Sequence, residues 1–279
     1  MPELPEVEVV RQDLSSSLVG QTIKSVQARD ALVLVGLLTP QQFARRLAGR
    51  TVQAVRRRGK VLIIELSGGR YLLVHLRMTG KLYPLSTDEP LPGHVRVIFR
   101  LSDGRRLIFA DPRRFGRLEI ADGARLSEAQ LLGKMGVDAL SPELDERTVG
   151  EMLRPHSIAI KQWLLDQTHI AGLGNIYASE VLHRCRIHPD TSAKALEAKQ
   201  VRALLRAMRR VLAEAIEWRG TTVSDYVTGQ GVPGGFQRRL RVYGRAGERC
   251  RCRRCAGVII RTTHAKRSTY YCPQCQSPP

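Results

Sequence analysis

The C-terminal end of the chain holds the side chains whose chemistry is easiest to assign. Five of the six cysteines lie in residues 250–275, and four of them form two Cys-x2-Cys pairs separated by sixteen residues. Paired thiols at this spacing are typical of a four-coordinate zinc site, in which two tight turns each supply two sulfurs. The candidate ligands are Cys252, Cys255, Cys272 and Cys275, with Cys250 as an alternative to Cys252. We expect one structural Zn²⁺ ion, closed to catalysis, to hold a ribbon too small for a core of its own.

The N-terminus could supply a nucleophile. Met1 is followed by Pro2, and removal of Met1 would leave Pro2 with a free secondary amine. An α-amino group has a pKa of about 7.7–8.0, so a useful fraction is neutral and nucleophilic near pH 7. The simpler interpretation of this acidic start is a helix whose first turn is favoured by Glu6 and Glu8.

A glycine-rich turn and the ribbon could both bind phosphate. Gly172 and Gly174 allow close approach of the backbone, and the amides of a following helix, with Asn175, could donate to an oxyanion. The same pattern is as common in an ordinary tight turn. Arg261 and residues 264–267 would project from the ribbon, where they suit phosphate contacts.

Two regions of different character must position these groups. Apolar spacing predicts a helix over residues 4–18, and a capping box at 39–42 opens a second, short helix. Two hairpins are predicted, 61–66 with 71–76 and 95–101 with 106–109. A further capping box at 127–130 begins a helical region that runs to about Trp218, most clearly over 196–218. A glycine- and proline-rich stretch at 228–235 is either a linker or a mobile lid.

The predicted fold is therefore α+β and multidomain. A β-sandwich flanked by helices occupies residues 1–130, a helical domain residues 131–240, and a zinc-ribbon hairpin residues 241–279.

Charge indicates a polyanionic partner. The formal net charge is +19, and residues 236–279 carry +10 of it. A basic excess of this size favours nucleic acid over a membrane surface. The longest apolar run, 31–38, is too short to span a bilayer, and the acidic start does not resemble a signal peptide. We expect an intracellular protein, cytoplasmic and nucleoid-associated, with no membrane partner.

Several motifs together resemble those of the bacterial formamidopyrimidine-DNA glycosylases over nearly the whole chain. They are Pro-Glu-Leu-Pro-Glu-Val-Glu at 2–8, Arg-Gly-Lys at 58–60, His-Leu-Arg-Met-Thr-Gly at 75–80, Asp-Pro-Arg-Arg-Phe-Gly at 111–116, Gly-Leu-Gly-Asn-Ile-Tyr-Ala at 172–178, and the cysteine ribbon. The turn at 172–178 is similar to the helix–two-turn–helix of that family. Leu4 and Pro5 after Glu3 resemble this branch rather than the related endonuclease VIII branch.

The resemblance implies a mechanism and a set of roles. Pro2 would attack C1′ of a damaged nucleotide and form a Schiff base, Glu3 would be the acid, and Lys60 and Arg267 would contact phosphate and assist β,δ-elimination. Met78, Arg113 and Phe115 would fill the space left by an extruded base, which costs a few kcal/mol of unstacking. The remaining implied contacts, with substrate or phosphate, are Glu6, His75, His94, Lys161 and Asn175. Residues 221–236 match a loop that covers the extruded base.

The ribbon departs from the pattern of the family. Two extra residues precede Cys255, while the spacing from Cys255 to Cys272 is unchanged, and this favours Cys252 as the ligand over Cys250.

The leading hypothesis is a bifunctional DNA glycosylase and apurinic/apyrimidinic lyase that removes 8-oxoguanine and formamidopyrimidines from duplex DNA as a monomer. One alternative is an endonuclease VIII-like enzyme that prefers oxidised pyrimidines. The other is a zinc-ribbon DNA-binding protein without catalysis, for which the basic C-terminal half would suffice.

Overall fold

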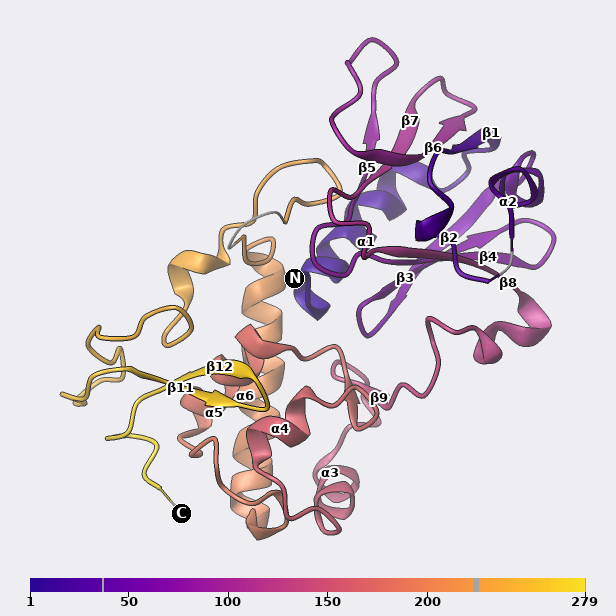
Figure 1. Ribbon diagram of the computed structural model, residues 1–279. Helices are drawn as coiled ribbons and strands as arrows, with labels where there is room; N and C mark the ends of the chain where they lie inside the picture. The colour runs from indigo at the N-terminus through magenta and orange to yellow at the C-terminus, as the bar shows by residue number, and fades with distance from the viewer. Residues whose placement is uncertain (37, 223–225, 279) are drawn as a thin grey trace. The chain divides into compact units, whose positions relative to one another are not determined.

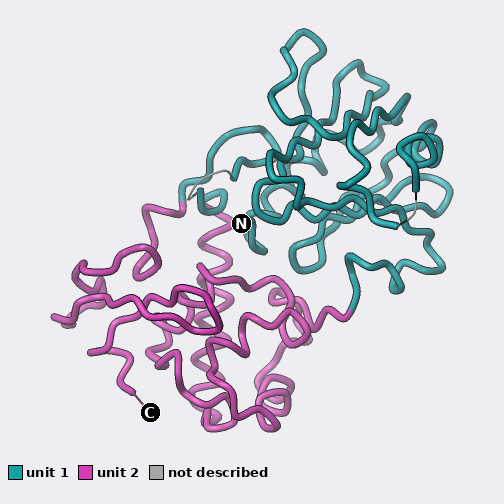
Figure 2. The backbone as a smooth tube through the Cα atoms, viewed as in Figure 1, with its two compact units in different colours: residues 1–133, 218–235 teal, residues 134–217, 236–279 magenta. Residues whose placement is uncertain are grey.

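The structure is a computed structural model that describes residues 1–36, 38–222 and 226–278. It contains two compact units (Figure 2). The first consists of residues 1–133 and 218–235, and the second of residues 134–217 and 236–279. The division into domains at 130/131 and 240/241 stays a prediction.

The first unit is a sandwich of two four-stranded antiparallel sheets with helices beside them (Figure 1). One sheet has the order β1-β6-β7-β5 and the other β2-β3-β4-β8. The strands are β1 (Ile23–Ala28), β2 (Val52–Arg58), β3 (Val61–Leu66), β4 (Arg70–His75), β5 (Lys81–Leu85), β6 (Val95–Leu101), β7 (Arg106–Ala110) and β8 (Arg117–Asp122). The helices are α1 (Leu4–Leu18), α2 (Pro40–Leu47), and the 3₁₀ turns η1 (Ala31–Val33) and η2 (Gly123–Glu128).

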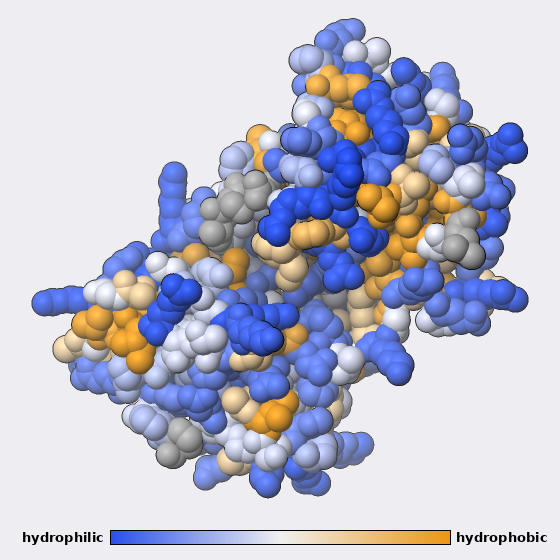
Figure 3. Space-filling model, in the orientation of Figure 1, coloured by the Kyte–Doolittle hydropathy of each residue, from blue (hydrophilic) through white to orange (hydrophobic). Residues whose placement is uncertain are grey.

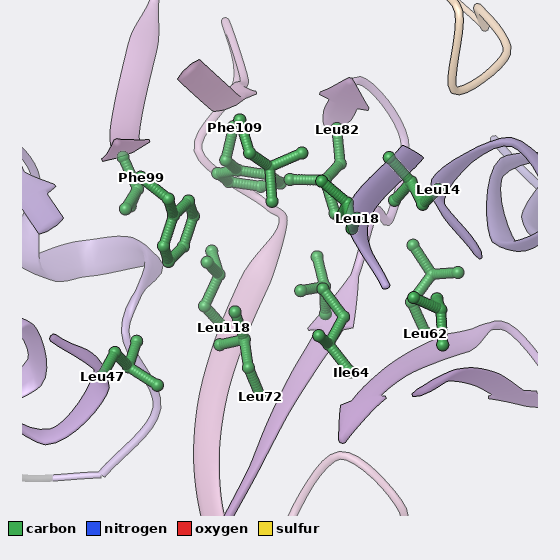
Figure 4. Packing of buried hydrophobic residues seen from close by; sticks show 14 of the residues in the cluster. Leu14, Leu18, Leu47, Leu62, Ile64, Leu72, Leu82, Phe99, Phe109 and Leu118 are labelled. Atoms are coloured by element: carbon green, nitrogen blue, oxygen red, sulfur yellow. The ribbon is translucent and has the colours of Figure 1, made fainter. Parts of the chain in front are cut away.

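The core of this unit lies between the two sheets. Leu62, Ile64 and Leu72 of one sheet face Phe99 and Phe109 of the other, and α1 closes the side of the sandwich (Figure 4). All five side chains are fully or almost fully buried. The alternation of apolar residues along β6 thus places one row of side chains in the core, as strand periodicity requires.

The helices predicted over 4–18 and from 39–42, and both predicted hairpins, are confirmed by α1, α2, β3–β4 and β6–β7. The capping box predicted at 127–130 is wrong, because the residues after η2 form turns and not a helix. Glu119 of β8 accepts hydrogen bonds from the N–H groups of Gln130 (2.8 Å) and Leu131 (2.8 Å). A carboxylate from a distant strand therefore satisfies the amides that a local cap was expected to bind.

The second unit is helical and ends in a two-stranded ribbon (Figure 1). Its elements are β9 (Val137–Asp138), α3 (Glu146–Leu153), α4 (Ile160–Leu165), β10 (Ile170–Ala171), α5 (Asn175–Cys185), η3 (Ala193–Ala195), α6 (Ala198–Glu217), η4 (Phe236–Arg239), β11 (Ile260–His264) and β12 (Arg267–Tyr271). Helix α6 confirms the prediction over 196–218, and its apolar stripe, which includes Leu204, Met208 and Val211, is buried. In the described part of the chain, no helix has the length and apolar character that would be needed to cross a membrane.

Candidate active site and zinc ribbon

The start of α1 is organised by two buried glutamates. Glu3 is the N-cap residue, and its backbone N–H donates to Glu6 Oε2 (2.8 Å), as in one half of a capping box. Pro2 is buried directly before this cap, whereas Met1 is 48% exposed. The cap thus fixes the backbone on which the nitrogen of Pro2 would be presented.

Glu6 also binds the segment that follows α6, which belongs to the first unit. The Thr221 N–H donates to Glu6 Oε1 (2.7 Å), so the two carboxylate oxygens join the start of α1 to residue 221. Further along α1, Arg219 Nη2 donates to both oxygens of the buried Asp13 (2.8 and 2.7 Å). Sequence reasoning missed Asp13, because one acid on a helix gives no sign of a partner two hundred residues away.

Tyr226 and the loop after it are held to the same helix. The Tyr226 hydroxyl donates to the backbone oxygen of Glu6 (3.3 Å), and burial is the main cause that raises the pKa of this phenol. Thr228 is fully buried, and its Oγ1 accepts from the N–H of Gln230 (3.2 Å). Residues 228–232 are therefore closed on themselves by hydrogen bonds, whereas the N–H groups of Gly234 and Gly235 donate to Thr222 Oγ1 (2.9 Å) and the Trp218 oxygen (2.9 Å). Part of the predicted lid, residues 223–225, lies outside the described residues.

Lys60 lies in the tight turn between β2 and β3 and is only 6% exposed. Arg57, at the end of β2, forms an ion pair with Glu8 of α1 (Nε–Oε2 2.9 Å), which holds this turn beside the first turns of α1. Lys60 is therefore not a solvated surface lysine, because its side chain is withdrawn from solvent. The turn that holds Lys60 thus lies beside α1, the helix that directly follows Pro2 and Glu3.

His75 ends β4 opposite the start of β3, where it lies near Lys60. Its Nδ1 accepts from the Arg77 N–H (3.0 Å). Burial, with the positive charges of Arg77 and Lys60, lowers the pKa of His75 from 6.5 to about 3. The imidazole is therefore neutral at physiological pH.

Met78 and Phe115 lie together at a pocket that also includes the N-terminus. The pocket, about 370 Å³ in volume, is lined by Met1, Arg77, Met78, Phe115 and Arg117. Met78 and Phe115 are 41% and 43% exposed, which is unusual for large apolar side chains. They are thus available to a partner.

Arg113 and Phe115 project from a loop that one buried carboxylate shapes. The Arg113 guanidinium lies 4.6 Å from the centre of the Phe115 ring. Asp111, fully buried, accepts from the N–H groups of Gly116 (2.7 Å) and Arg113 (3.2 Å) and from the Thr79 hydroxyl. Asp111 therefore links the 75–80 motif to the 111–116 motif, a positioning role that the sequence alone did not reveal.

His94 is exposed and precedes β6 with a left-handed backbone (φ 64°). It is not among the residues that line the pocket of Met78 and Phe115.

In the second unit, Lys161 and Asn175 meet at the glycine turn between α4 and α5. Lys161 is fully buried, and its Nζ donates to the backbone oxygen of Asn175 (3.0 Å) and to Ser179 Oγ (2.6 Å). The Asn175 amide donates to the backbone oxygen of Ser268 in β12 (2.7 Å). These two residues thus join the turn to the ribbon, on which Arg267 begins β12 and is exposed.

A buried acid anchors the chain where it enters the ribbon. Glu180 of α5 is fully buried and accepts hydrogen bonds from the backbone N–H groups of Arg241, Val242 and Tyr243 (2.9–3.0 Å). Sequence reasoning did not find Glu180, because a helical glutamate resembles a solvated one until its partners are known.

The cysteines of the ribbon converge, but the group of four differs from the predicted one. Cys250, Cys255, Cys272 and Cys275 hold their sulfurs within 4.8 Å of one another. The Cys250–Cys275 and Cys255–Cys272 Sγ distances are 3.7 and 3.6 Å. With Zn–S bonds of about 2.3 Å, tetrahedral thiolates lie roughly 3.8 Å apart, so this group fits one zinc ion.

Cys252, the predicted ligand, lies beside a histidine. Its Sγ is 3.5 Å from Nε2 of the fully buried His183, and Cys250 Sγ is 3.3 Å from the same nitrogen. The Cys250 N–H donates to the Gly257 oxygen (2.8 Å), and Cys250 is buried whereas Cys252 is half-buried. Cys250, Cys252 and Cys275 with His183 form a second, overlapping group.

The fold and these groups define a class of two-unit DNA-repair proteins with a zinc ribbon, as the comparisons with known proteins show. Three family models match: the formamidopyrimidine-DNA glycosylase N-terminal domain over residues 1–118, its H2TH domain over 135–227, and a zinc finger found in FPG and IleRS over 251–278. The chain belongs to the formamidopyrimidine-DNA glycosylase family.

Curated relatives and solved structures match this chain over nearly its full length. Formamidopyrimidine-DNA glycosylases of Herpetosiphon aurantiacus and Pelotomaculum thermopropionicum are 42% and 43% identical, with 99% of this chain and 100% and 99% of theirs covered. A point mutant of the Lactococcus lactis FPG, solved with a Fapy-dG containing DNA, superposes with a TM-score of 0.91 at 36% identity and covers 99% of this chain and 100% of its own. A complex of wild-type Lactococcus lactis Fpg with an oxidized pyrimidine containing DNA has a TM-score of 0.90.

Proposed function

We propose that this chain is a bifunctional glycosylase and lyase that excises oxidised purines from duplex DNA, with Pro2 as the nucleophile. One observation carries the proposal: Met1, directly before Pro2, lines the same pocket as Met78 and Phe115. In a member of this family, that arrangement supports an N-terminal amine that acts beside the side chains that would occupy the space of an extruded nucleotide.

The chemistry begins when Met1 is removed and the neutral amine of Pro2 attacks C1′. The bond between C1′ and the base breaks, the base leaves, and Glu3 donates a proton to the sugar-ring oxygen as the ring opens. The departing base, which takes the bonding electron pair, takes up the proton that the amine loses, and the product is an iminium ion. This cation acidifies the C2′ hydrogen, so that elimination breaks the C3′–O bond and then the C5′–O bond, and water finally releases the sugar fragment from Pro2.

Other residues of the chain position these groups. Glu6 fixes the backbone of Glu3 through the 2.8 Å hydrogen bond, and the Lys60 turn lies against the same helix. We assign phosphate contacts to Lys60, His75, His94, Lys161, Asn175 and Arg267, and the filling of the vacated space to Met78, Arg113 and Phe115. A structural zinc ion, when bound, supplies no reactive group, since all its ligands are protein thiolates.

Borohydride trapping tests the nucleophile. The processed chain, its Met1 removal verified by mass spectrometry, is mixed with duplexes carrying 8-oxoguanine opposite cytosine, a formamidopyrimidine or an oxidised pyrimidine. We expect a covalent adduct, strongest with the two purine lesions. A chain blocked by one extra N-terminal residue should give no adduct. If the blocked chain traps equally, Pro2 is not the nucleophile, and if no chain traps, the DNA-binding protein without catalysis is the better model. The strongest adduct with the pyrimidine would indicate the endonuclease VIII-like preference.

A further inference from the structure

A cluster of arginines in the second unit has no role in the mechanism above. Two adjoining cavities lie at the C-terminal end of α5 and beside α6, and they share Arg184, Arg210 and Arg241. Their volumes are about 400 and 230 Å³. The other arginines that line them are Arg186, Arg206, Arg238, Arg239 and Arg251. We call these two cavities the arginine groove. Glu214 is the one acidic residue among its described lining residues.

The charge of the groove is not balanced by its own lining. Glu214 forms ion pairs with both Arg184 (Nη2–Oε2 2.8 Å) and Arg210 (Nε–Oε1 3.0 Å), so two guanidinium groups share one carboxylate. The hydrogen bond from Arg184, despite opposing desolvation, lowers the pKa of Glu214, which keeps this acid ionised. The described lining therefore carries a large excess of positive charge.

Arg184 carries donors that no described protein group uses. Its side chain is only 7% exposed. Within the described part of the chain, its Nε and Nη1 are buried without a hydrogen-bond partner. Buried donors of a charged group are normally satisfied, and an exception calls for an explanation.

The groove is separate from the predicted phosphate contacts of the lesion site. Asn175 begins α5 and Cys185 ends it, so the eleven residues of the helix place its ends about 15 Å apart. The arginine groove is at the end of α5 opposite Asn175. The C-terminal end of α5 also favours arginines at this location, because the last carbonyl groups of a helix attract cations.

We propose that the arginine groove is a second anion site, which binds phosphate groups that do not belong to the lesion contacts. Guanidinium groups match phosphate oxygens in a bidentate geometry, and a site built from arginine without lysine is typical of such recognition. The phosphates come either from the DNA backbone beyond the lesion or from a free polyphosphate, which presents the same oxyanions.

The test uses the zinc-loaded full chain and two double variants of equal charge change. Arg206→Gln with Arg210→Gln removes two exposed cations of the groove. The matched control is Arg147→Gln with Arg202→Gln, because these exposed arginines lie on α3 and α6 but do not line the groove. Sodium tripolyphosphate binding is measured by calorimetry. Binding of an undamaged 12-bp and an undamaged 30-bp duplex is measured by fluorescence anisotropy over a salt series.

We expect wild type to bind tripolyphosphate, the groove variant to bind at least tenfold more weakly, and the control to change less than threefold. If the DNA backbone is the source, the slope of log K against log[salt] for the 30-bp duplex becomes shallower by about 2 in the groove variant alone. Each lost phosphate contact lowers the magnitude of this slope by about 0.9. If the slope is unchanged while tripolyphosphate binding is lost, a free polyphosphate is the source. Glu214→Gln should strengthen tripolyphosphate binding severalfold, a gain that misfolding does not produce. Equal behaviour of the groove and control variants toward both probes overturns the proposal.

Discussion

The sandwich of the first unit and the ribbon of the second are stabilised by different means. The sandwich buries a continuous apolar core drawn from both sheets and α1 (Figure 4). The ribbon has a cluster of only four buried residues, and two of them, Cys250 and Cys272, are cysteines. Burial of apolar surface can fold the first, whereas the second depends on its metal. On the face seen in Figure 3, hydrophilic residues are mixed with several hydrophobic patches.

The largest expected effect separates the two regions directly. Cys250→Ser should abolish zinc retention against a competing chelator and unfold the ribbon, because about 10–16 kcal/mol of metal binding supports folding in such small domains. The sandwich should keep its own thermal transition. Cys252→Ser is the matched control and should retain zinc. Zinc content by metal analysis and unfolding by calorimetry measure both effects. Loss of zinc in Cys252→Ser with retention in Cys250→Ser would restore the ligand set predicted from spacing.

The second effect is confined to the sandwich. Phe99 is fully buried in β6, so Phe99→Ala should lower the free energy of unfolding of the first unit by about 3–5 kcal/mol through lost burial and a cavity. Zinc affinity should not change. Phe115→Ala removes the same side chain at a 43% exposed position, and its cost should stay below about 0.5 kcal/mol. Denaturant unfolding with a parallel zinc titration tests this pair. A weaker zinc site in Phe99→Ala would mean that the two regions are energetically coupled.

The regular elements could be predicted because their signals are local. The apolar spacing of α1, the capping box of α2 and the turns of the hairpins each lie within a few residues of the element that they specify. The capping box at 127–130 failed because Glu119, from another strand, binds the amides of Gln130 and Leu131. No local pattern contains that partner.

The candidate site could be assembled from the sequence only through the resemblance to a family. Spacing indicated the zinc ribbon and favoured Cys252, whereas the four cysteine sulfurs that converge in the structure include that of Cys250, and Cys252 belongs to an overlapping group with His183. Asp111, Glu180 and Asp13 bind backbone amides or a distant arginine. Such positioning residues cannot be told from solvated acids without the fold, since their partners are remote in the chain.

The smallest expected effect is the pH dependence of the free energy of unfolding of the sandwich. The pKa of His75 is about 3 in the folded chain and 6.5 ordinarily. The unfolded state therefore binds a proton below about pH 6.5 that the folded state does not, so the free energy of unfolding falls as pH drops from 6.5 toward 3, by at most about 1.4 kcal/mol per pH unit. His75→Gln removes this contribution and should flatten the dependence between pH 7 and pH 5. His94→Gln, at an exposed histidine of the same unit, should leave it unchanged. Denaturant unfolding of the first unit at pH 7, 6 and 5 measures the slopes. Equal slopes in the two variants would show that His75 is protonated in the folded chain, and hence that acid acts on the sandwich through other groups.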